Sequence, residues 1–204
     1  MNFKQVKNGE EILLIPVPCS YHDCIELARS DYYRYTGKIV SFWRLWLATF
    51  RNPCFKFSFW LRLSAYPGCF YRFCRLMQYR YARKYGLQIP PKTAIGYGLY
   101  IGHGFGTIVN PTAVIGNNVN LSQFTTIGSN HGQAAVIGNN VYVGPSVCLV
   151  EAVHIGSDVS IGAGAVVTKD IPQGMTAAGV PARVIGVNKH GNYIGRRWKL
   201  SAAI

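Results

Sequence analysis

The sequence predicts a mainly β protein, a parallel β-helix of about four coils that follows an N-terminal helical region. Three observations carry this prediction. Aliphatic residues recur every six positions through the second half of the chain, many of them are followed by glycine, and the first half has apolar residues at helical spacing instead. The chain has 204 residues, 49% of them hydrophobic, which is enough for one compact domain or two small ones.

The six-residue period runs from Ile95 to Val167. A short strand needs one inward aliphatic residue, and the glycine or asparagine after it permits a tight turn because it tolerates a positive φ. Three such strands close one coil, and stacked coils pair their backbones around a continuous core. The predicted anchors, three to a coil, are Ile95, Ile101 and Val109; Ile115, Leu121 and Ile127; Ile137, Val143 and Leu149; Ile155, Ile161 and Val167.

Two insertions interrupt the period. Two extra residues fall between Ile101 and Val109, beside His103, and four fall between Ile127 and Ile137, in "GSNHGQAAVIG". Insertions into a solenoid become loops, and loops often carry function. Both loops are therefore candidate parts of a site.

Helical sequence precedes the coils. Ser20 is a predicted N-cap with Asp23 three residues later, and apolar residues follow one helical face from Ile39 to Phe50 before Asn52-Pro53. A further helix is predicted to run to about Tyr85, where Gly86 stops it; its apolar face is expected to hold Phe70, Phe73, Cys74, Met77 and Tyr81. We expect a cap over the open end of the solenoid, and a second interpretation places these basic, aromatic helices on an anionic membrane surface.

We therefore expect four segments. Residues 1–38 form an N-terminal segment with one helix, residues 39–85 a basic aromatic helical region, and residues 86–186 the β-helix. Residues 187–204 form a basic tail that is either mobile or lies on a neighbouring subunit.

The charge distribution favours an anionic partner. The net charge is +13, and no Asp or Glu occurs from Tyr32 through Val150. Phosphates, anionic lipids and acidic glycans suit such a segment, whereas no nucleic-acid-binding motif accompanies the charge. No apolar run is long enough to cross a bilayer and the start is a poor signal peptide, so the expected location is the cytoplasm, with contact to the inner face of the membrane under the second interpretation.

Six cysteines are present, and none forms a C-x-x-C pair. We expect reduced thiols rather than a disulfide framework, and no metal site.

His103 is the candidate catalytic residue. The residues two beyond the second anchor of each coil are His103, Gln123, Pro145 and Ala163, and we expect them to align along one edge. Small residues there would leave a shallow groove for a long, thin cofactor whose reactive end lies at the histidine. A neutral imidazole could then remove the proton of an attacking hydroxyl, and backbone N–H groups of "HGFG" could stabilise the oxyanion.

The segments "IGYGLYIGHGFGTIVNPTAVIGNNVNLSQFTTIG" and "VIGNNVYVGPSV…HIGSDVSIGAGAVVTKDIP…AAGVPARVIG" resemble the hexapeptide-repeat acyltransferases, in particular the branch related to serine acetyltransferases. The resemblance covers residues 86–186 and implies a left-handed β-helix, a homotrimer with acetyl-CoA between subunits, and His103 as general base. It places the cofactor along Pro145 and Ala163, and the residues expected to contact it are Gln123, Gly144, Pro145, Ser146, Gly162, Ala163, Lys169 and Arg183.

Departures from that branch bear on the acceptor. Gly102 and Gln88 stand where serine acetyltransferases carry acids, and "GSNHGQAA" replaces their Arg-His-Pro loop. A serine ammonium needs a carboxylate, which Asp23, Glu26, Asp31 or Glu151 would have to supply. Gln88 or a backbone carbonyl would orient the imidazole. The residues expected to orient the base or bind the acceptor are Gln88, Asn110, Asn130 and His131, the last being either an acceptor-site residue for a neighbouring subunit or a solvated loop histidine.

The stretch "IPPKTAIGYGLYIGHGFGTIVN", with the aromatic and basic helices before it, resembles the O-acetyltransferases that modify capsular, exopolysaccharide or O-antigen sugars. The predicted function is acetyl-CoA-dependent O-acetylation of a sugar hydroxyl of a bacterial surface polysaccharide or its lipid-linked precursor. The alternative is a serine O-acetyltransferase or another small-molecule O-acetyltransferase. A non-enzymatic β-helix scaffold is the third hypothesis, and His103 argues against it.

Overall fold

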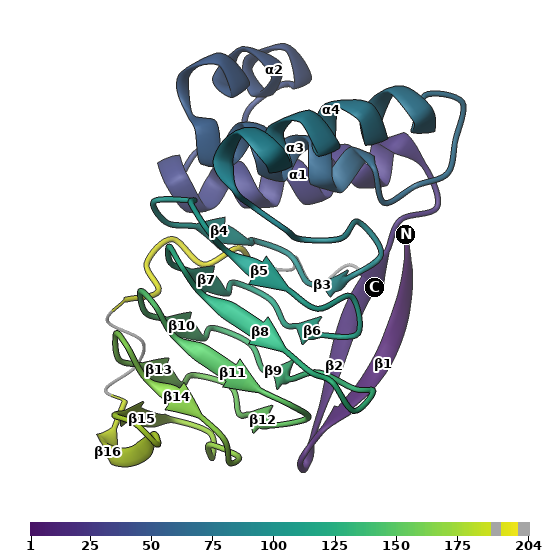
Figure 1. Cartoon of the computed structure of the whole chain (residues 1–204). Helices are drawn as coiled ribbons and strands as arrows, with labels where there is room; N and C mark the ends of the chain where they lie inside the picture. The colour runs from purple at the N-terminus through teal and green to yellow at the C-terminus, as the bar shows by residue number, and fades with distance from the viewer. Residues whose placement is uncertain (189–192, 200–204) are drawn as a thin grey trace.

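The computed structural model describes residues 1–188 and 193–199. Its body is a three-sided β-solenoid of four coils, with a layer of helices across one end and a hairpin along one side (Figure 1). The helices are α1 (Tyr21–Thr36), α2 (Phe42–Arg51), α3 (Pro53–Leu63) and α4 (Tyr71–Tyr85). The predicted fold class is thereby confirmed.

Three parallel sheets form the sides of the solenoid. The first face holds β3 (Ala94–Ile95), β6 (Val114–Ile115), β9 (Val136–Ile137) and β12 (His154–Ile155). The second face holds β4 (Tyr100–Ile101), β7 (Asn120–Leu121), β10 (Tyr142–Val143) and β13 (Ser160–Ile161), extended by β15 (Met175–Ala178) and β16 (Arg183–Val187). The third face holds β5 (Ile108–Val109), β8 (Thr126–Gly128), β11 (Cys148–Val150) and β14 (Val166–Val167).

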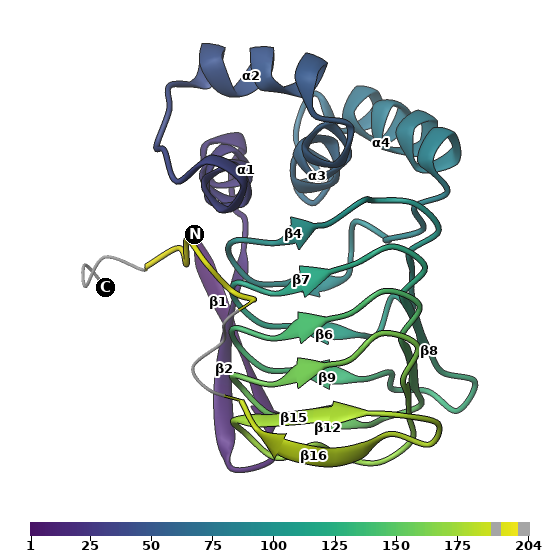
Figure 2. The same ribbon diagram turned by 90° about the vertical axis from the view of Figure 1, so that its left-hand side faces the viewer.

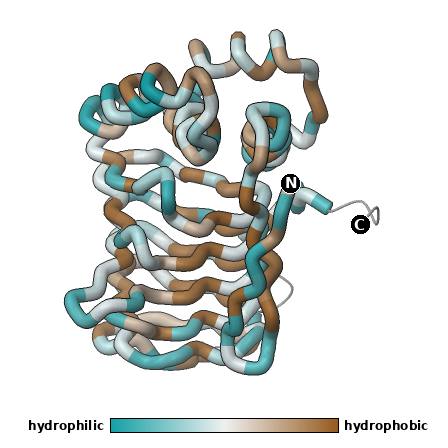
Figure 3. Tube along the Cα trace, turned by 90° about the vertical axis from the view of Figure 1, so that its right-hand side faces the viewer, coloured by the Kyte–Doolittle hydropathy of each residue, from teal (hydrophilic) through white to brown (hydrophobic). Residues whose placement is uncertain are grey.

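The predicted anchors stack in register. Ile101 pairs with Leu121, Leu121 with Val143, and Val143 with Ile161, and the other two faces repeat this pattern. All twelve anchors are buried, none more than 5% exposed, and hydrophobic segments recur down the stacked coils (Figure 3). The six-residue period therefore specifies one continuous core, because each inward side chain lies directly above its equivalent in the next coil.

An N-terminal hairpin lies along the first face. β1 (Asn2–Asn8) and β2 (Glu11–Val17) pair antiparallel. Leu13 and Ile15 pack with Val114 and Val136 of the solenoid, and the Glu11 carboxylate accepts hydrogen bonds from the Ser157 hydroxyl. Only a helix is expected in residues 1–38 from the sequence, so the hairpin is an addition to that expectation.

The helical region closes the end of the solenoid at the first coil, as the cap interpretation expects. α1 and α3 contact β4, and Ser20 caps α1 by accepting from the Asp23 N–H. Asp31 of α1 and Arg62 of α3 form a buried ion pair, and Arg62 donates to the Ile95 and Gly96 carbonyls of the first coil. The junction between cap and coils thus contains a buried, hydrogen-bonded ion pair beside the apolar contacts of Phe57 and Leu61 with the solenoid core.

α2 and α4 lie on the outside of that layer (Figure 2). The prediction for the apolar face of α4 is wrong in part: Phe70 and Phe73 are 64% and 53% exposed, whereas Cys74 and Gln78 are buried. α4 contacts the rest of the cap mainly through α3, and its buried residues are Cys74 and Gln78. Helical spacing therefore identifies the element correctly but not the face that is buried.

The C-terminal segment contacts the chain's own second face. Asn120 donates to the Tyr193 carbonyl, the Tyr142 and Tyr193 rings stack at 4.6 Å, and Asn118 contacts the backbone of Trp198 through both its amide groups. For residues 193–199 these contacts within the chain are an addition to the expectation of a mobile or neighbour-bound tail. Residues 189–192 and 200–204 of that predicted tail lie outside the described residues.

Candidate active site

His103 lies at the corner between the second and third faces, in the loop that joins β4 to β5. Its side chain is exposed and its backbone has a φ of 51°, the left-handed conformation. No hydrogen bond involves its imidazole among the described residues. An exposed, unengaged imidazole at a corner is available to an external hydroxyl group.

The alignment predicted for this corner is correct for three residues and wrong for His103. The Ser146 N–H donates to the Gln123 carbonyl and the Gly164 N–H to the Pro145 carbonyl, so Gln123, Pro145 and Ala163 share one register. The Phe124 N–H donates to the Phe105 carbonyl in the same pattern. Phe105 is therefore the first-coil equivalent of Gln123, and His103 and Gly104 are the two inserted residues.

Two helices hold this loop from the cap side. The Tyr35 hydroxyl of α1 donates to the Ile101 carbonyl at 3.0 Å and accepts from the Ile101 N–H at 3.1 Å. Burial raises the pKa of the Tyr35 phenol well above its ordinary value, so it remains a neutral donor. The Cys54 sulfur of α3 accepts from the Gly104 N–H at 3.1 Å. Sequence reasoning missed both residues, which lie 66 and 50 positions before their partners.

Hydrogen bonds of this loop leave only some backbone N–H groups of "HGFG" free to bind the oxyanion that forms during acetyl transfer. The N–H of Gly104 is taken by Cys54, and the N–H of Gly106 donates to the Tyr85 carbonyl at 3.4 Å. The N–H groups of His103 and Phe105 have no partner among the described residues. Of the four residues in "HGFG", His103 and Phe105 are thus the candidates for binding a developing oxyanion.

Gln88 contacts the segment that follows the His103 loop through backbone hydrogen bonds only. Its N–H donates to the Thr107 carbonyl and its carbonyl accepts from the Val109 N–H, both at 2.8 Å. Its side chain is exposed, and no hydrogen bond links it to His103 in the described chain. The expectation that Gln88 orients the imidazole has no support in this structure.

The other predicted acceptor residues gather at the opposite edge of the third face. Asn110 donates to the Ser129 carbonyl at 3.2 Å and accepts from the Thr112 N–H, so it structures the turn after β5. Asn130 and His131 lie on the loop between β8 and β9 and are exposed. Within one chain, the structure does not bring these three residues to His103.

Glu151 organises that loop, which we call the 129–135 loop. Its carboxylate accepts from the Ser129 hydroxyl at 2.7 Å and from the backbone N–H groups of Asn130 and His131 at 3.2 and 3.3 Å. The His131 Nδ1 lies 3.3 Å from the same carboxylate. The Ser129 hydrogen bond, with help from the Asn130 N–H, lowers the pKa of the Glu151 carboxyl. A carboxylate is thus fixed beside His131.

The remaining acids considered as partners for an ammonium are engaged elsewhere. Asp23 lies 3.1 Å from the N-terminal amine, Glu26 pairs with Arg29, and Asp31 is fully buried against Arg62. Of the four acids that the sequence offered, Glu151 alone lies on a loop of the solenoid.

The expected cofactor edge carries small residues in the third and fourth coils, whereas Phe124 is exposed in the second. Pro145 is half-buried, while Ser146, Ala163 and Gly164 are exposed. The Gln123 side-chain oxygen is buried without a hydrogen-bond partner in the described chain, which is costly unless a ligand or water satisfies it. Gly144 and Gly162 pack against the next coil, where an added Cβ would lie 2.7 Å from the Ile161 carbonyl oxygen and 3.0 Å from the Ala178 Cβ, respectively. Lys169 and Arg183 are exposed near the far end of the solenoid.

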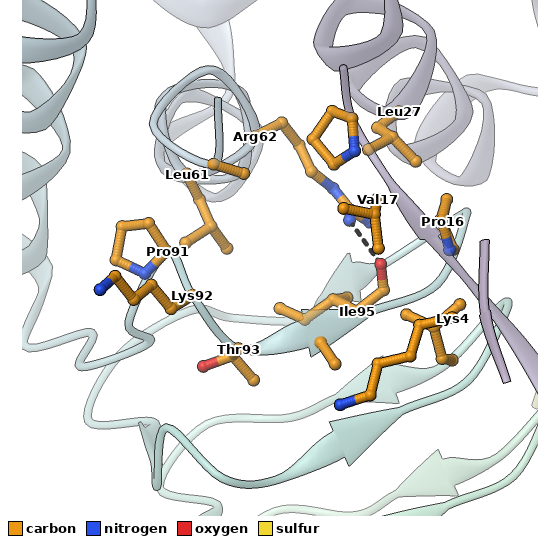
Figure 4. Close-up of a pocket in the computed structure, with 14 residues that line it drawn as sticks. Lys4, Pro16, Val17, Leu27, Leu61, Arg62, Pro91, Lys92, Thr93 and Ile95 are labelled. Carbon is orange, nitrogen blue, oxygen red and sulfur yellow. Dashed lines mark hydrogen bonds between the residues drawn. The ribbon is translucent and has the colours of Figure 1, made fainter. Parts of the chain in front are cut away.

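A separate cavity of about 250 Å³ lies between β2, α3 and the segment that enters β3 (Figure 4). Lys4, Arg62 and Lys92 are among the residues that line it, and the rest of the lining is largely apolar. It borders the first face, whereas His103 stands between the second and third faces. This cavity is therefore separate from the His103 corner.

Residues 1–188 and 193–199 lack the features of two other classes of protein. No cluster of three or more His, Cys, Asp or Glu residues there could hold a metal ion. None of the helices in that part of the chain is both long and apolar enough to cross a membrane.

Comparisons with known proteins agree with the fold. A family model described as "Bacterial transferase hexapeptide (six repeats)" matches residues 134–169. A serine acetyltransferase of Helicobacter pylori is 34% identical over 146 residues, covering 62% of this chain and 85% of that protein. One from Synechococcus elongatus is 33% identical over 139 residues, covering 65% of this chain. The match spans about half of the Synechococcus protein, 54% of its length.

Solved structures give the same result. A serine acetyltransferase of Neisseria gonorrhoeae in complex with serine aligns with a TM-score of 0.67 and 27% identity, over 79% of this chain and 69% of that one. Another, solved in complex with CoA, has a TM-score of 0.65 over 80% of this chain and 70% of that one; at 23% identity it supports the fold alone. The relatives named here are serine acetyltransferases, so the expectation of a closer similarity to polysaccharide O-acetyltransferases is not supported.

Proposed function

The chain belongs to the serine acetyltransferase family, and from that premise we propose that it transfers the acetyl group of acetyl-CoA to a hydroxyl group, with His103 as the general base. The single observation that carries this proposal is the position of His103. It is one of two residues inserted at a solenoid corner, its imidazole is exposed, and the same corner carries small residues in the third and fourth coils.

The residues present fit this chemistry. An alcohol is a weak nucleophile, and a neutral imidazole that accepts its proton during attack contributes typically about 10²–10⁴-fold to the rate. The thioester supplies the acetyl group, and the N–H groups of His103 and Phe105 are free to bind the oxyanion that forms. The protonated His103 then returns the proton to the departing thiolate. Along the edge below, the unpartnered Gln123 oxygen offers an acceptor for the pantetheine amides, and Lys169 and Arg183 offer charges for the phosphates.

L-serine is the leading acceptor, because the relatives named above are serine acetyltransferases. Its ammonium requires a carboxylate, and Glu151 is the acid suited to supply one. Glu151 and His103 lie at opposite edges of the third face, so they could act together only if they belong to different subunits.

The uncovered face supports such an assembly. The hairpin covers the first face, and residues 193–199 contact the second. On the third face, the outward residues Ile108 and Val150 are exposed, and Cys148 is half-buried. If this face points toward a rotation axis, the His103 edge of one subunit meets the 129–135 loop of the next, and a heterologous contact of this kind closes into a ring. A homotrimer with sites between subunits is the assembly that we propose.

A sugar hydroxyl is the second candidate acceptor, and a specific observation favours it. No hydrogen bond or ion pair joins a carboxylate to residues 102–106 in the described chain. The Phe105 and Phe124 rings, 6.0 Å apart, are both exposed beside His103 and offer apolar faces for a sugar to stack on. A sugar of a bacterial surface polysaccharide or of its lipid-linked precursor would need no carboxylate.

The test is acceptor-dependent release of CoA thiol, measured with L-serine and with a panel of bacterial oligosaccharides. Turnover of serine alone supports the first acceptor, and turnover of sugars alone supports the second. If neither serine nor any of the sugars causes release of CoA thiol although acetyl-CoA is bound, the proposed function is overturned.

A matched pair of variants tests the role of Glu151. We expect Glu151→Gln to raise the KM for serine at least about 30-fold, because it removes one partner of a charge pair that the neighbouring subunit would bury. Glu10→Gln, at an exposed hairpin turn, should leave the KM unchanged. An unchanged serine KM in the Glu151 variant, or an active monomer by light scattering, would remove the shared site from the account.

A further inference from the structure

The outer side of α2 carries large apolar side chains that the fold does not bury. Trp43 is 71% exposed, Phe50 64% and Leu47 55%, and Ile39 just before the helix is 70% exposed. The inner side of the helix, with Leu45 and Ala48, is buried against the cap. α2 therefore carries apolar residues on both sides, and the larger ones face away from the protein.

α4 continues the same surface. Phe70, Phe73, Leu76 and Tyr79 are each more than half exposed. An apolar hollow of about 340 Å³ lies between the two helices, and residues of both line it together with Trp60 of α3. We define the outer helical surface by its exposed apolar residues: Ile39, Phe42, Trp43, Trp46, Leu47, Phe50, Phe70, Phe73, Leu76 and Tyr79.

The charges on this surface are all positive. Arg44 and Arg51 of α2 are exposed, and the exposed cations of α4 are Arg72, Arg80, Arg83 and Lys84. No acid occurs anywhere from residue 32 to residue 150. A contiguous patch of exposed apolar side chains is typical of an interaction site. The cations among these side chains favour an anionic partner.

We propose that the outer helical surface docks on an anionic lipid bilayer. Helices with arginine and lysine beside tryptophan, phenylalanine and leucine insert their apolar side chains at the boundary between headgroups and acyl chains. Tryptophan favours this boundary because its ring is largely apolar and its N–H can bond to headgroups or water. A bilayer satisfies both parts of the surface, the apolar side chains by burial and the arginines by lipid phosphates.

A second copy of the chain suits the surface less well. Two such surfaces placed face to face would bring arginines of α2 and α4 together with no acid between them, and like charges across an interface are strongly unfavourable. A nucleic acid would engage the cations but leave aliphatic residues such as Leu47 and Leu76 exposed. Charge complementarity together with apolar burial thus selects the anionic bilayer.

Docking would also orient the solenoid. The helices cover the end at the first coil, which carries His103, and the fourth coil lies at the far end (Figure 1). The bound protein would therefore hold the His103 corner closer to the lipid surface than any later coil. This orientation does not depend on which acceptor the enzyme uses.

The experiment is co-sedimentation of the full chain with large vesicles of phosphatidylcholine, alone or with about one third phosphatidylglycerol. We expect binding to the anionic vesicles at least about tenfold stronger than to the neutral ones, weakening as salt is raised. Tryptophan fluorescence should shift to shorter wavelength on binding, because Trp43 enters an apolar environment.

Variants with matched controls assign the surface. We expect the double variant Trp43→Ser, Leu47→Ser to weaken vesicle binding by at least about tenfold. The pair Arg44→Gln, Arg51→Gln should weaken it by about fivefold per arginine. The control, Val180→Ser with Ile185→Ser, removes equally exposed apolar residues just before and within β16 and should leave binding unchanged. Circular dichroism checks that each variant is folded.

Two results would overturn the proposal. One is equal binding to neutral and anionic vesicles, or binding to neither. The other is a change of oligomeric state in the Trp43 and Leu47 variant without any loss of lipid binding, since that would show a second copy of the chain to be the occupant.

Discussion

Asp31→Asn perturbs the junction between the helical region and the first coil. The Oδ1 atom of Asp31 accepts from Arg62 and from the Leu99 N–H, both at 2.8 Å, and Oδ2 accepts from the Arg62 Nε at 2.8 Å and from the Ser58 hydroxyl. Asp31 is fully buried and Arg62 is 4% exposed. Every acceptor position of the carboxylate faces a donor.

The substitution keeps the size of the side chain but removes its negative charge and one of its two acceptor atoms. Whichever oxygen the NH2 group replaces, it would face a donor, and the Arg62 guanidinium would be left buried without a counter-charge. Breaking a buried pair in this way costs about 3–5 kcal/mol. For a chain of this size, 1 kcal/mol lowers the melting temperature by about 2–4 °C, so we expect a fall of about 6–20 °C.

The assay is thermal unfolding followed by circular dichroism at one fixed protein concentration, since assembly affects stability. The control is Glu26→Gln, which breaks the ion pair with Arg29 at a site where Glu26 is 33% exposed. Exposed pairs contribute about 0–1 kcal/mol, so its melting temperature should fall by less than about 4 °C. If Asp31→Asn melts within about 2 °C of the wild type, the reasoning about this junction is refuted.

Two further predictions concern the hairpin and a buried thiol. Leu13→Ala should destabilise the protein by about 2–5 kcal/mol because Leu13 is fully buried against the first face. The control is Leu14→Ala, which should cost less than about 1 kcal/mol because Leu14 is 42% exposed. Equal effects of the two variants in chemical denaturation would show that the hairpin does not pack as described. Burial raises the pKa of the Cys24 thiol to about 12, so iodoacetamide at pH 8 should modify the exposed Cys19 and Cys69 in the native protein and leave Cys24 unmodified, as read by peptide mass spectrometry. Modification of Cys24 at the rate of Cys69 would contradict its burial.

The solenoid could be predicted from sequence because its core is specified locally. Each anchor is followed within two residues by its own turn, and the period places Leu121 above Val143 without knowledge of any distant contact. The helices followed from local signals too, such as Ser20 as N-cap and Gly86 as stop. Which face of α4 is buried depends on α3, and no local pattern shows that.

The hairpin was missed although a signal was present. Gly9 and Glu10 form the two-residue loop between the strands, and Gly9 has the positive φ that glycine tolerates at the first position of such a turn. Its packing partners Val114 and Val136 point outward from the solenoid, so their role could not be inferred from the inward anchors. The hairpin of residues 1–17 could thus have been predicted from the residues of its turn, but not from the six-residue repeat.

The site was predictable only in part. The insertion beside His103 is visible in the spacing, but counting forward from Ile101 put His103 in register with Gln123, where hydrogen bonding places Phe105. Cys54 and Tyr35 reach the loop from helices far back in the sequence. In the sequence, Asp31 is one of four candidate partners for an ammonium, and only the structure shows that Arg62 engages it. Polar contacts between residues far apart in the sequence produce no periodic pattern, so they could not be predicted from the repeat.

The central claim is that the His103 imidazole acts as the general base of an acetyl transfer. The direct measurement is release of CoA thiol by the His103→Ala variant with the acceptor that the wild type uses, alongside equilibrium binding of acetyl-CoA to both proteins. We expect kcat to fall by at least about 10²-fold while the affinity for acetyl-CoA is retained. A folded His103→Ala variant that turns over at close to the wild-type rate would contradict it.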